Sequence, residues 1–287
     1  MGFRVDTGED ANEKDFIRVS KEPGGRLAYL RRFPTALLWI DKPSLLEQMV
    51  AIGMINEHGH NRQNFRLSVM NFVKLDDEIV LNVISASNQD IPNLEWYSDK
   101  IICKAIERNS GRFKSLSSPS EKVMMTYANQ RWIDMALLIK RNPSEKVLMR
   151  AIISNAANIA YIPNPSFALM EKAVRKNGDC LQHIQNPPEE IVRIAVSKSG
   201  MAIAHVKNPS EELQRLAVSR SANAITVIDN PIPELQIAAV DKSPNVIRLI
   251  KNPDEDAMWK ALQQKPKLIS SIKNATPEME SFAQIVS

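Results

Sequence analysis

The sequence is poor in the residues on which most chemistry depends. Its 287 residues include two cysteines, four histidines and nine glycines, and aromatic residues make up 6% of the chain. Cys103 and Cys180 lie far apart, which argues against a disulfide framework and favours a cytoplasmic setting. The sequence contains no Gly-x-Ser-x-Gly motif and no glycine loop for phosphate. We therefore expect a protein that is not an enzyme and needs no cofactor; a catalytic site would have to lie in residues 1–96.

Long apolar runs are also missing. No stretch approaches the length of 18 uncharged apolar residues that indicates a membrane-spanning helix. The first residues lack the apolar core of a secretory signal. The sequence thus predicts no membrane association and no export.

What the sequence does contain is a repeat of 22 residues. Asn-Pro pairs recur at that spacing from Asn142-Pro143 to Asn252-Pro253, and eight residues after each Pro comes an Ala followed by an aliphatic residue. These alanines are Ala151, Ala173, Ala195, Ala217, Ala239 and Ala261. A fixed period of this length is typical of a repeat array.

The local sequence predicts two helices in each repeat. In one repeat, Asn208 is expected to cap the first helix, with Pro209 at its first position and Glu211 at the spacing of a capping box. Apolar residues then recur at helical spacing over about three turns. A second, shorter segment around Ile225 and Ile228 is expected to form α or 3₁₀ helix.

Neither helix can bury its apolar face alone, so the repeats are expected to stack. The predicted fold is all-α, an α-solenoid of stacked two-helix repeats that form one continuous curved superhelix. We divide it into an N-terminal extension, irregular repeats with an insertion near 57–66, regular repeats and a capping helix. Their ranges are 1–20, 21–142, 143–275 and 276–287.

The opening Asn208-Pro209-Ser210-Glu211-Glu212 resembles those of short α-solenoid repeat families found in bacterial and bacteriophage proteins of unknown function. The array is also similar to leucine-rich-variant and HEAT-like repeats. The resemblance covers residues 143–275 well and 43–142 poorly. It implies a scaffold that binds other macromolecules and supplies no catalytic residues. In a phage it would imply capture of a host or defence protein, or service as a virion or assembly component.

Basic residues recur at one position of the repeat, eleven residues after its start, and we call this set the basic ladder. Its members are Arg108, Lys176, Lys198, Arg220 and Lys242. One interpretation is that they complement the negative ends of helices. The other is that they bind phosphates or an acidic partner, together with Arg112 and Lys114 from the basic stretch 97–150. Few aromatic residues accompany the ladder, which weakens the case for nucleic acid.

The insertion near 57–66 and two later histidines are the remaining candidates. His58, His60, Asn61 and Arg62 fall in the insertion, where we expect contact with a partner rather than a metal site, since the ligand set is incomplete. His183 and His205 share one repeat position, which predicts packing at the second helix rather than a metal or pH-sensitive pair. Cys180 occupies a position held elsewhere by small apolar residues and is expected to be buried.

The sequence thus predicts a non-enzymatic scaffold that binds another macromolecule, a protein, along its groove or through the irregular repeats. The alternative is nucleic-acid binding through the basic ladder. No metal, cofactor or membrane enters either interpretation.

Overall fold

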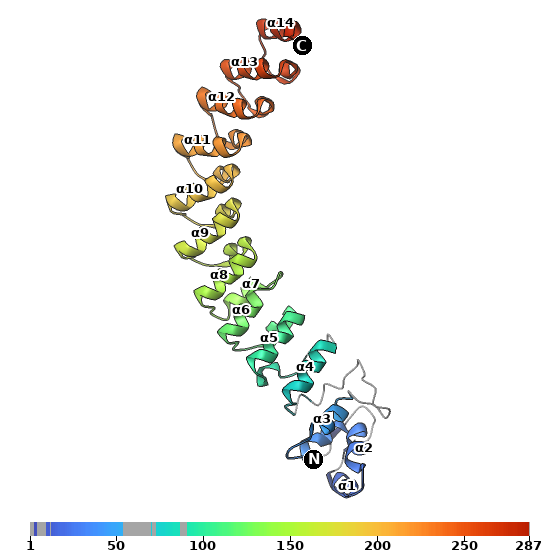
Figure 1. Ribbon diagram of the computed structural model, residues 1–287. Coiled ribbons are helices and arrows are strands. Elements are labelled where there is room, and N and C mark those ends of the chain that lie inside the picture. The colour runs from blue at the N-terminus through green and yellow to red at the C-terminus, as the bar shows by residue number, and fades with distance from the viewer. Residues whose placement is uncertain are drawn as a thin grey trace. The chain divides into compact units, whose positions relative to one another are not determined.

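The computed structural model describes residues 3–4, 10–11, 13–53, 70, 73–86 and 91–286. The chain divides into two compact units, Met1–Val147 and Leu148–Ser287, and each is described here by itself. In both units α-helices alternate with shorter helical segments, most of them 3₁₀ helices (Figure 1). The predicted all-α repeat fold is confirmed.

The first unit opens with two short strands, β1 (Phe3–Arg4) and β2 (Asp10–Ala11), which pair antiparallel. Its next elements are α1 (Glu13–Val19), α2 (Gly25–Arg32), the 3₁₀ helix η1 (Pro34–Trp39), α3 (Leu45–Ala51) and α4 (Asp77–Ala86). The ring of Phe16 lies 5.6 Å from those of Tyr29 and Trp39. The segment predicted as an N-terminal extension therefore includes a packed helix.

The rest of the first unit follows the repeat more closely. It contains η3 (Leu94–Trp96), α5 (Asp99–Arg108), η4 (Ser110–Ser115), α6 (Glu121–Ala128) and α7 (Met135–Ile139). The rings of Phe113 and Tyr127 stack with their centroids 3.9 Å apart. In the repeat that holds α6, the second helix is α7, an α-helix rather than a 3₁₀ helix.

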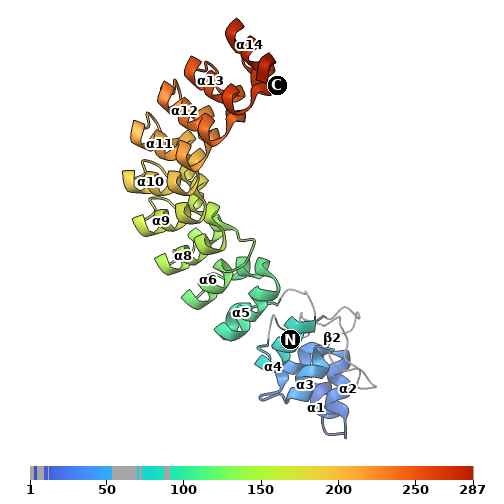
Figure 2. The ribbon, with the colours of Figure 1, turned by 45° about the horizontal axis from the view of Figure 1, so that its top comes forward.

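The second unit repeats one pattern, a ten-residue α-helix followed by a six-residue 3₁₀ helix. The α-helices are α8 (Glu145–Ser154), α9 (Phe167–Lys176), α10 (Glu189–Lys198), α11 (Glu211–Arg220), α12 (Pro233–Lys242), α13 (Glu255–Gln264) and α14 (Pro277–Val286). The 3₁₀ helices are η5 (Ala156–Tyr161), η6 (Gly178–His183), η7 (Gly200–His205), η8 (Ala222–Val227), η9 (Pro244–Leu249) and η10 (Pro266–Ser271). The α-helices stack on one another, and the 3₁₀ helices lie beside them in a second layer (Figure 2).

The repeated alanine sets the packing of this unit. All six alanines of the row, from Ala151 to Ala261, are fully buried. The aliphatic residue that follows each of them is at most 2% exposed. Their carbonyls lie close to the neighbouring repeat: a Cβ added to Gly200 would stand 2.4 Å from the carbonyl oxygen of Ala217. No side chain fits so close an approach at Gly200.

The junction between repeats differs from the prediction. The helix α11 is capped by Ser210, whose Oγ accepts from the backbone N–H of Leu213 at 3.3 Å, and Glu211 is its first residue. Asn208 instead takes the left-handed conformation, with φ of 49°. Asn142, Asn164, Asn186 and Asn230 do the same, with φ between 47° and 50°.

The predicted roles of Asn208 as cap, Pro209 as first helical residue and Glu211 as the distal capping-box residue are therefore wrong. The turn between repeats needs a positive φ, and Asn tolerates that conformation better than most residues. Once Asn208 makes the turn, the helix begins further along the chain and the serine becomes the cap. A complete capping box does occur in the first unit, between Ser44 and Glu47.

The packing of the alanine row makes a prediction for stability. Ala239→Leu inserts a larger side chain where the α-helices meet, and overpacking of a close-packed core should lower the free energy of unfolding by about 1–3 kcal/mol. Ala238→Leu is the matched control, because Ala238 is the exposed neighbour on the same helix. Urea unfolding followed by circular dichroism measures both. Equal stability of the two variants would contradict the packing described here.

Candidate protein-interaction surface

The 3₁₀ helices of the second unit begin directly where the α-helices end. In two repeats an asparagine makes the transition: the side chain of Asn155 accepts from the N–H of Ala157, and that of Asn177 from the N–H of Asp179, both at 3.1 Å. Ser199, Ser221 and Ser243 occupy the same position with the same extended backbone. The helices η5 to η9 each bury two or three of their residues, such as Ala202 and Ile203 in η7, and η10 buries Leu268.

The outward residues of these helices form a surface that we call the 3₁₀ face. It consists of Ala157, Ala160, Tyr161, Gln182, His183, Met201, Ala204, His205, Asn223, Thr226, Val227, Asn245, Arg248 and Leu249, all exposed. Several are large and apolar, with Tyr161 59% and Leu249 55% exposed. The face therefore presents apolar and aromatic side chains to solvent in successive repeats.

The 3₁₀ helices carry few charges. Those of the second unit contain only Asp179, Arg248 and Lys267 as charged residues, whereas each of the α-helices α8–α13 contains three or four. Depletion of charge together with exposed aromatic residues and methionine distinguishes the cores of protein interfaces from the rest of a surface. The 3₁₀ face shares the depletion of charge, since Arg248 is its one charged member, and it exposes Tyr161 and Met201.

The positions of His183 and His205 correct an expectation from the sequence. Both were predicted to pack at the second helix, but both are exposed, as are Tyr161, Val227 and Leu249 at the same repeat position. The reason is that this position ends each 3₁₀ helix, and the next residue, such as Ile184, turns inward instead. The variety of side chains at this position was the available signal, because a core position admits fewer kinds.

The basic ladder lies at the last residue of α5 and of α9–α12, and its five side chains are exposed. Lys176 donates to the carbonyls of Ile153 and Ser154, and Lys242 donates to the carbonyl of Ser219. These carbonyls belong to the end of the preceding α-helix, where they have no partner within the helix. The contacts of these two lysines favour the helix-end interpretation of the ladder.

Arg112 is not available to a partner. It is 4% exposed, and its Nη1 donates to the carbonyl oxygen of Ala105 at 3.3 Å. Asn158 holds the same place in its repeat and donates to the carbonyl oxygen of Ala151 at 2.8 Å. The prediction of Arg112 as a binding residue is wrong, because its long side chain reaches inward to the alanine carbonyl, whereas Lys114 is exposed.

Three further expectations concern the insertion, metal binding and membrane association. His58, His60, Asn61 and Arg62, with the whole insertion near 57–66, lie outside the described residues. Within the described ranges no three His, Cys, Asp or Glu side chains are grouped to hold a metal ion. None of the helices placed by the structure is both long and apolar enough to cross a membrane.

Both cysteines are free and buried, as expected for Cys180. Cys180 is 2% exposed, and burial, with a smaller contribution from the charge of Asp179, raises the pKa of its thiol. Cys103 accepts a hydrogen bond on Sγ from Thr126 Oγ1 at 3.1 Å. A reactive cysteine needs a lowered pKa and access to solvent, and Cys180 has neither.

Comparison with protein-family models, with curated proteins and with solved structures finds no match. The resemblance to short α-solenoid repeats stays a prediction. The interpretation of function rests on the geometry of the second unit.

The environment of Cys180 predicts its reactivity. At neutral pH we expect iodoacetamide to modify Cys180 far more slowly in the folded chain than after unfolding in urea, because the thiol is buried and its pKa is raised. Mass spectrometry of proteolytic peptides separates Cys180 from Cys103. Fast modification of Cys180 in the folded chain would show that the thiol is accessible and would reopen the question of a nucleophile.

Proposed function

We propose that this chain is a non-enzymatic helical-repeat scaffold that binds another protein, and that the 3₁₀ face of residues 148–287 makes the contact. The observation that carries the proposal is the row of exposed side chains at one repeat position. Tyr161, His183, His205, Val227 and Leu249 occupy it in successive repeats. Removing the apolar members of this row, Tyr161, Val227 and Leu249, from water is a favourable contribution to association.

The repeat geometry suits a partner of some length. A stable interface of standard size buries about 800 Å² on each partner, which is more than one six-residue helix can supply. Successive 3₁₀ helices present equivalent positions, so their contributions combine along the array. A partner segment that crosses several repeats would meet an apolar or aromatic side chain in each.

Binding of nucleic acid through the basic ladder remains the alternative, with less support. Lys176 and Lys242 already donate to helix carbonyls. The second unit also offers few aromatic side chains on which bases could stack. A ladder that serves mainly to complete helix ends would bind phosphate weakly.

The proposed cellular location rests on the sequence. We place the protein in the cytoplasm of a bacterium, or of the infected cell if a phage encodes it. In a phage, a host or defence protein or a virion component would be the partner class. The widely separated cysteines and the resemblance to bacterial and phage repeats support this setting.

Affinity capture from a lysate of the source organism, with and without nuclease, tests the proposal. We expect Tyr161→Ser combined with Leu249→Ser to lose a nuclease-resistant protein partner that the parent chain retains, because both changes remove exposed apolar surface from the 3₁₀ face. The matched control combines Phe167→Ser with Ile285→Ser, which are 41% and 83% exposed but lie on α-helices.

Quantitative mass spectrometry of the captured material gives the result. Equal capture by the two double variants would remove the 3₁₀ face from the proposal. Loss of all bound protein after nuclease treatment would favour the nucleic-acid alternative.

A further inference from the structure

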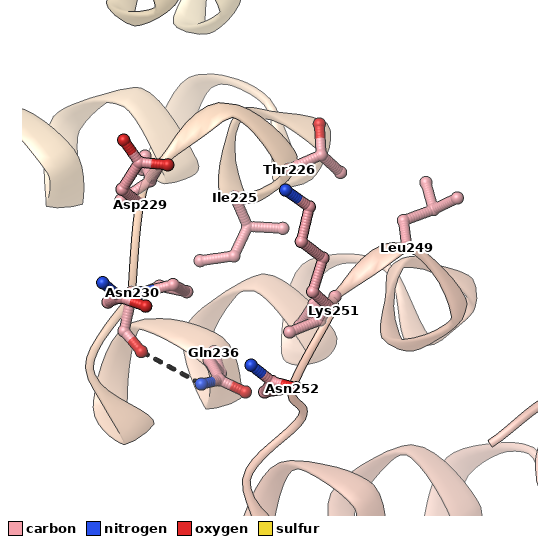
Figure 3. A pocket seen from close by; sticks show the side chains of 11 residues that line it. Ile225, Thr226, Asp229, Asn230, Gln236, Leu249, Lys251 and Asn252 are labelled. Atoms are coloured by element: carbon pink, nitrogen blue, oxygen red, sulfur yellow. Dashed lines mark hydrogen bonds between the residues drawn. The ribbon is translucent and has the colours of Figure 1, made fainter. Parts of the chain in front are cut away.

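A hollow of about 300 Å³ lies between the repeats that contain η8 and η9 (Figure 3). Ile225, Ile228 and Ile250 line it, and each is less than 10% exposed. Leu249, which is 55% exposed, belongs both to the lining and to the 3₁₀ face. Asp229 and Lys251 come from the two loops that follow the 3₁₀ helices. The isoleucines thus supply the apolar part of a lining that is mostly polar and holds one charge of each sign.

The wall of the hollow is held by Gln236. Its Nε2 donates to the carbonyl oxygen of Pro231 at 3.0 Å, drawn as the dashed line in Figure 3, and its Oε1 accepts from the N–H of Asp254 at 2.8 Å. Gln236 is 5% exposed and links the starts of two successive repeats. Because its amide groups are occupied by the protein itself, they fix the wall of the hollow and leave the isoleucines as the part of the lining that suits an apolar group.

The charge of the 3₁₀ side changes along the second unit. Residues 156–165 carry no charge, and the corresponding stretches 178–187, 200–209 and 222–231 carry one charged residue each. The stretches 244–253 and 265–276 contain no acidic residue, and their basic residues are Arg248, Lys251, Lys265, Lys267 and Lys273. All five are exposed. This end of the 3₁₀ side is therefore basic.

Neighbouring carboxylates of the described residues do not neutralise three of these lysines. Within the described ranges, the side chains of Lys251, Lys267 and Lys273 take part in no ion pair. By contrast, Lys260 on α13 pairs with Asp241 at 3.2 Å. Lys251 lines the hollow, and Lys267 and Lys273 follow in the next repeat. Exposed cations near apolar side chains suit a ligand that offers both apolar groups and negative charge.

We propose that the 3₁₀ face at η8 and η9, together with η10 and the loops that hold Lys251 and Lys273, binds an acidic protein segment. An apolar side chain of the segment fills the hollow beside Leu249, and its carboxylates face Arg248, Lys251, Lys267 and Lys273. This inference rests on the proposed function and adds the chemistry of the partner. The charges should speed association and make the affinity fall as salt rises.

A random-sequence peptide library displayed on phage, selected on the full chain, tests this inference. We expect the selected peptides to be enriched in Asp and Glu next to aliphatic or aromatic residues. Combining Lys251→Glu, Lys267→Glu and Lys273→Glu should weaken their binding by roughly tenfold or more, since attraction becomes repulsion. Fluorescence polarisation of labelled peptides measures the affinities, and circular dichroism checks that the variant folds.

The matched control combines Lys172→Glu, Lys198→Glu and Arg220→Glu. It changes the net charge by the same amount, but its residues lie on α9, α10 and α11. Unchanged peptide affinity in this control, beside the loss in the first variant, would locate the acidic segment at the basic end of the 3₁₀ face.

Three results would overturn the inference. The first is selection of peptides without acidic enrichment, or of none. The second is equal affinity for the parent and for the variant with changes at 251, 267 and 273. The third is displacement of the peptides by a single-stranded oligonucleotide that itself needs these lysines, which would assign the site to nucleic acid. The proposed function would survive the first two if capture from lysate still depended on Tyr161 and Leu249.

Discussion

The close approach of neighbouring helices at the repeated alanine is the constraint on which the second unit depends. Each alanine is fully buried, and its carbonyl oxygen accepts the N–H that ends the helix, as Ala217 does from Ser221 at 2.9 Å. The same carbonyl oxygen lies 2.4 Å from where a Cβ on Gly200 would stand. The repeated alanine and its carbonyl oxygen thus fix three things: the spacing of the α-helices, the end of each α-helix and the start of the 3₁₀ helix. The left-handed asparagine then returns the chain to begin the next repeat.

This constraint separates the residues that make the fold from those that are free to vary. Acidic residues gather in the first turns of several α-helices and basic residues at their last turns, where they complement the helix ends. The 3₁₀ helices need no such charges, and their outward positions carry tyrosine, histidine, methionine, valine and leucine. Arg248 donates to the carbonyl oxygen of Asn245 in its own helix, whereas Lys251, Lys267 and Lys273 stand out because they form no ion pair with another described residue. We therefore infer that recognition uses the side chains that the fold does not require.

Much of the fold was predictable from the sequence, and much less of the surface was. The spacing of Asn-Pro pairs and alanines predicted an all-α repeat of two helices, because core packing repeats strictly. The cap was misassigned because Asn208 suits both a helix cap and a left-handed turn, and only the backbone decides between them. Arg112 was taken for a surface cation, yet a buried carbonyl lies within its reach. His183 and His205 were assigned to packing because periodicity shows that positions are equivalent without showing which way they face.

We propose that the 3₁₀ face, rather than the α-helices, contacts the partner. Hydrogen–deuterium exchange of the full chain, with and without its captured protein partner, tests this most directly. With the partner bound, we expect slower exchange of the backbone amides in η5 to η10 and in the loops that follow them. The exchange of α9 to α12 should stay unchanged. Protection confined to the α-helices and the basic ladder at their ends would contradict it.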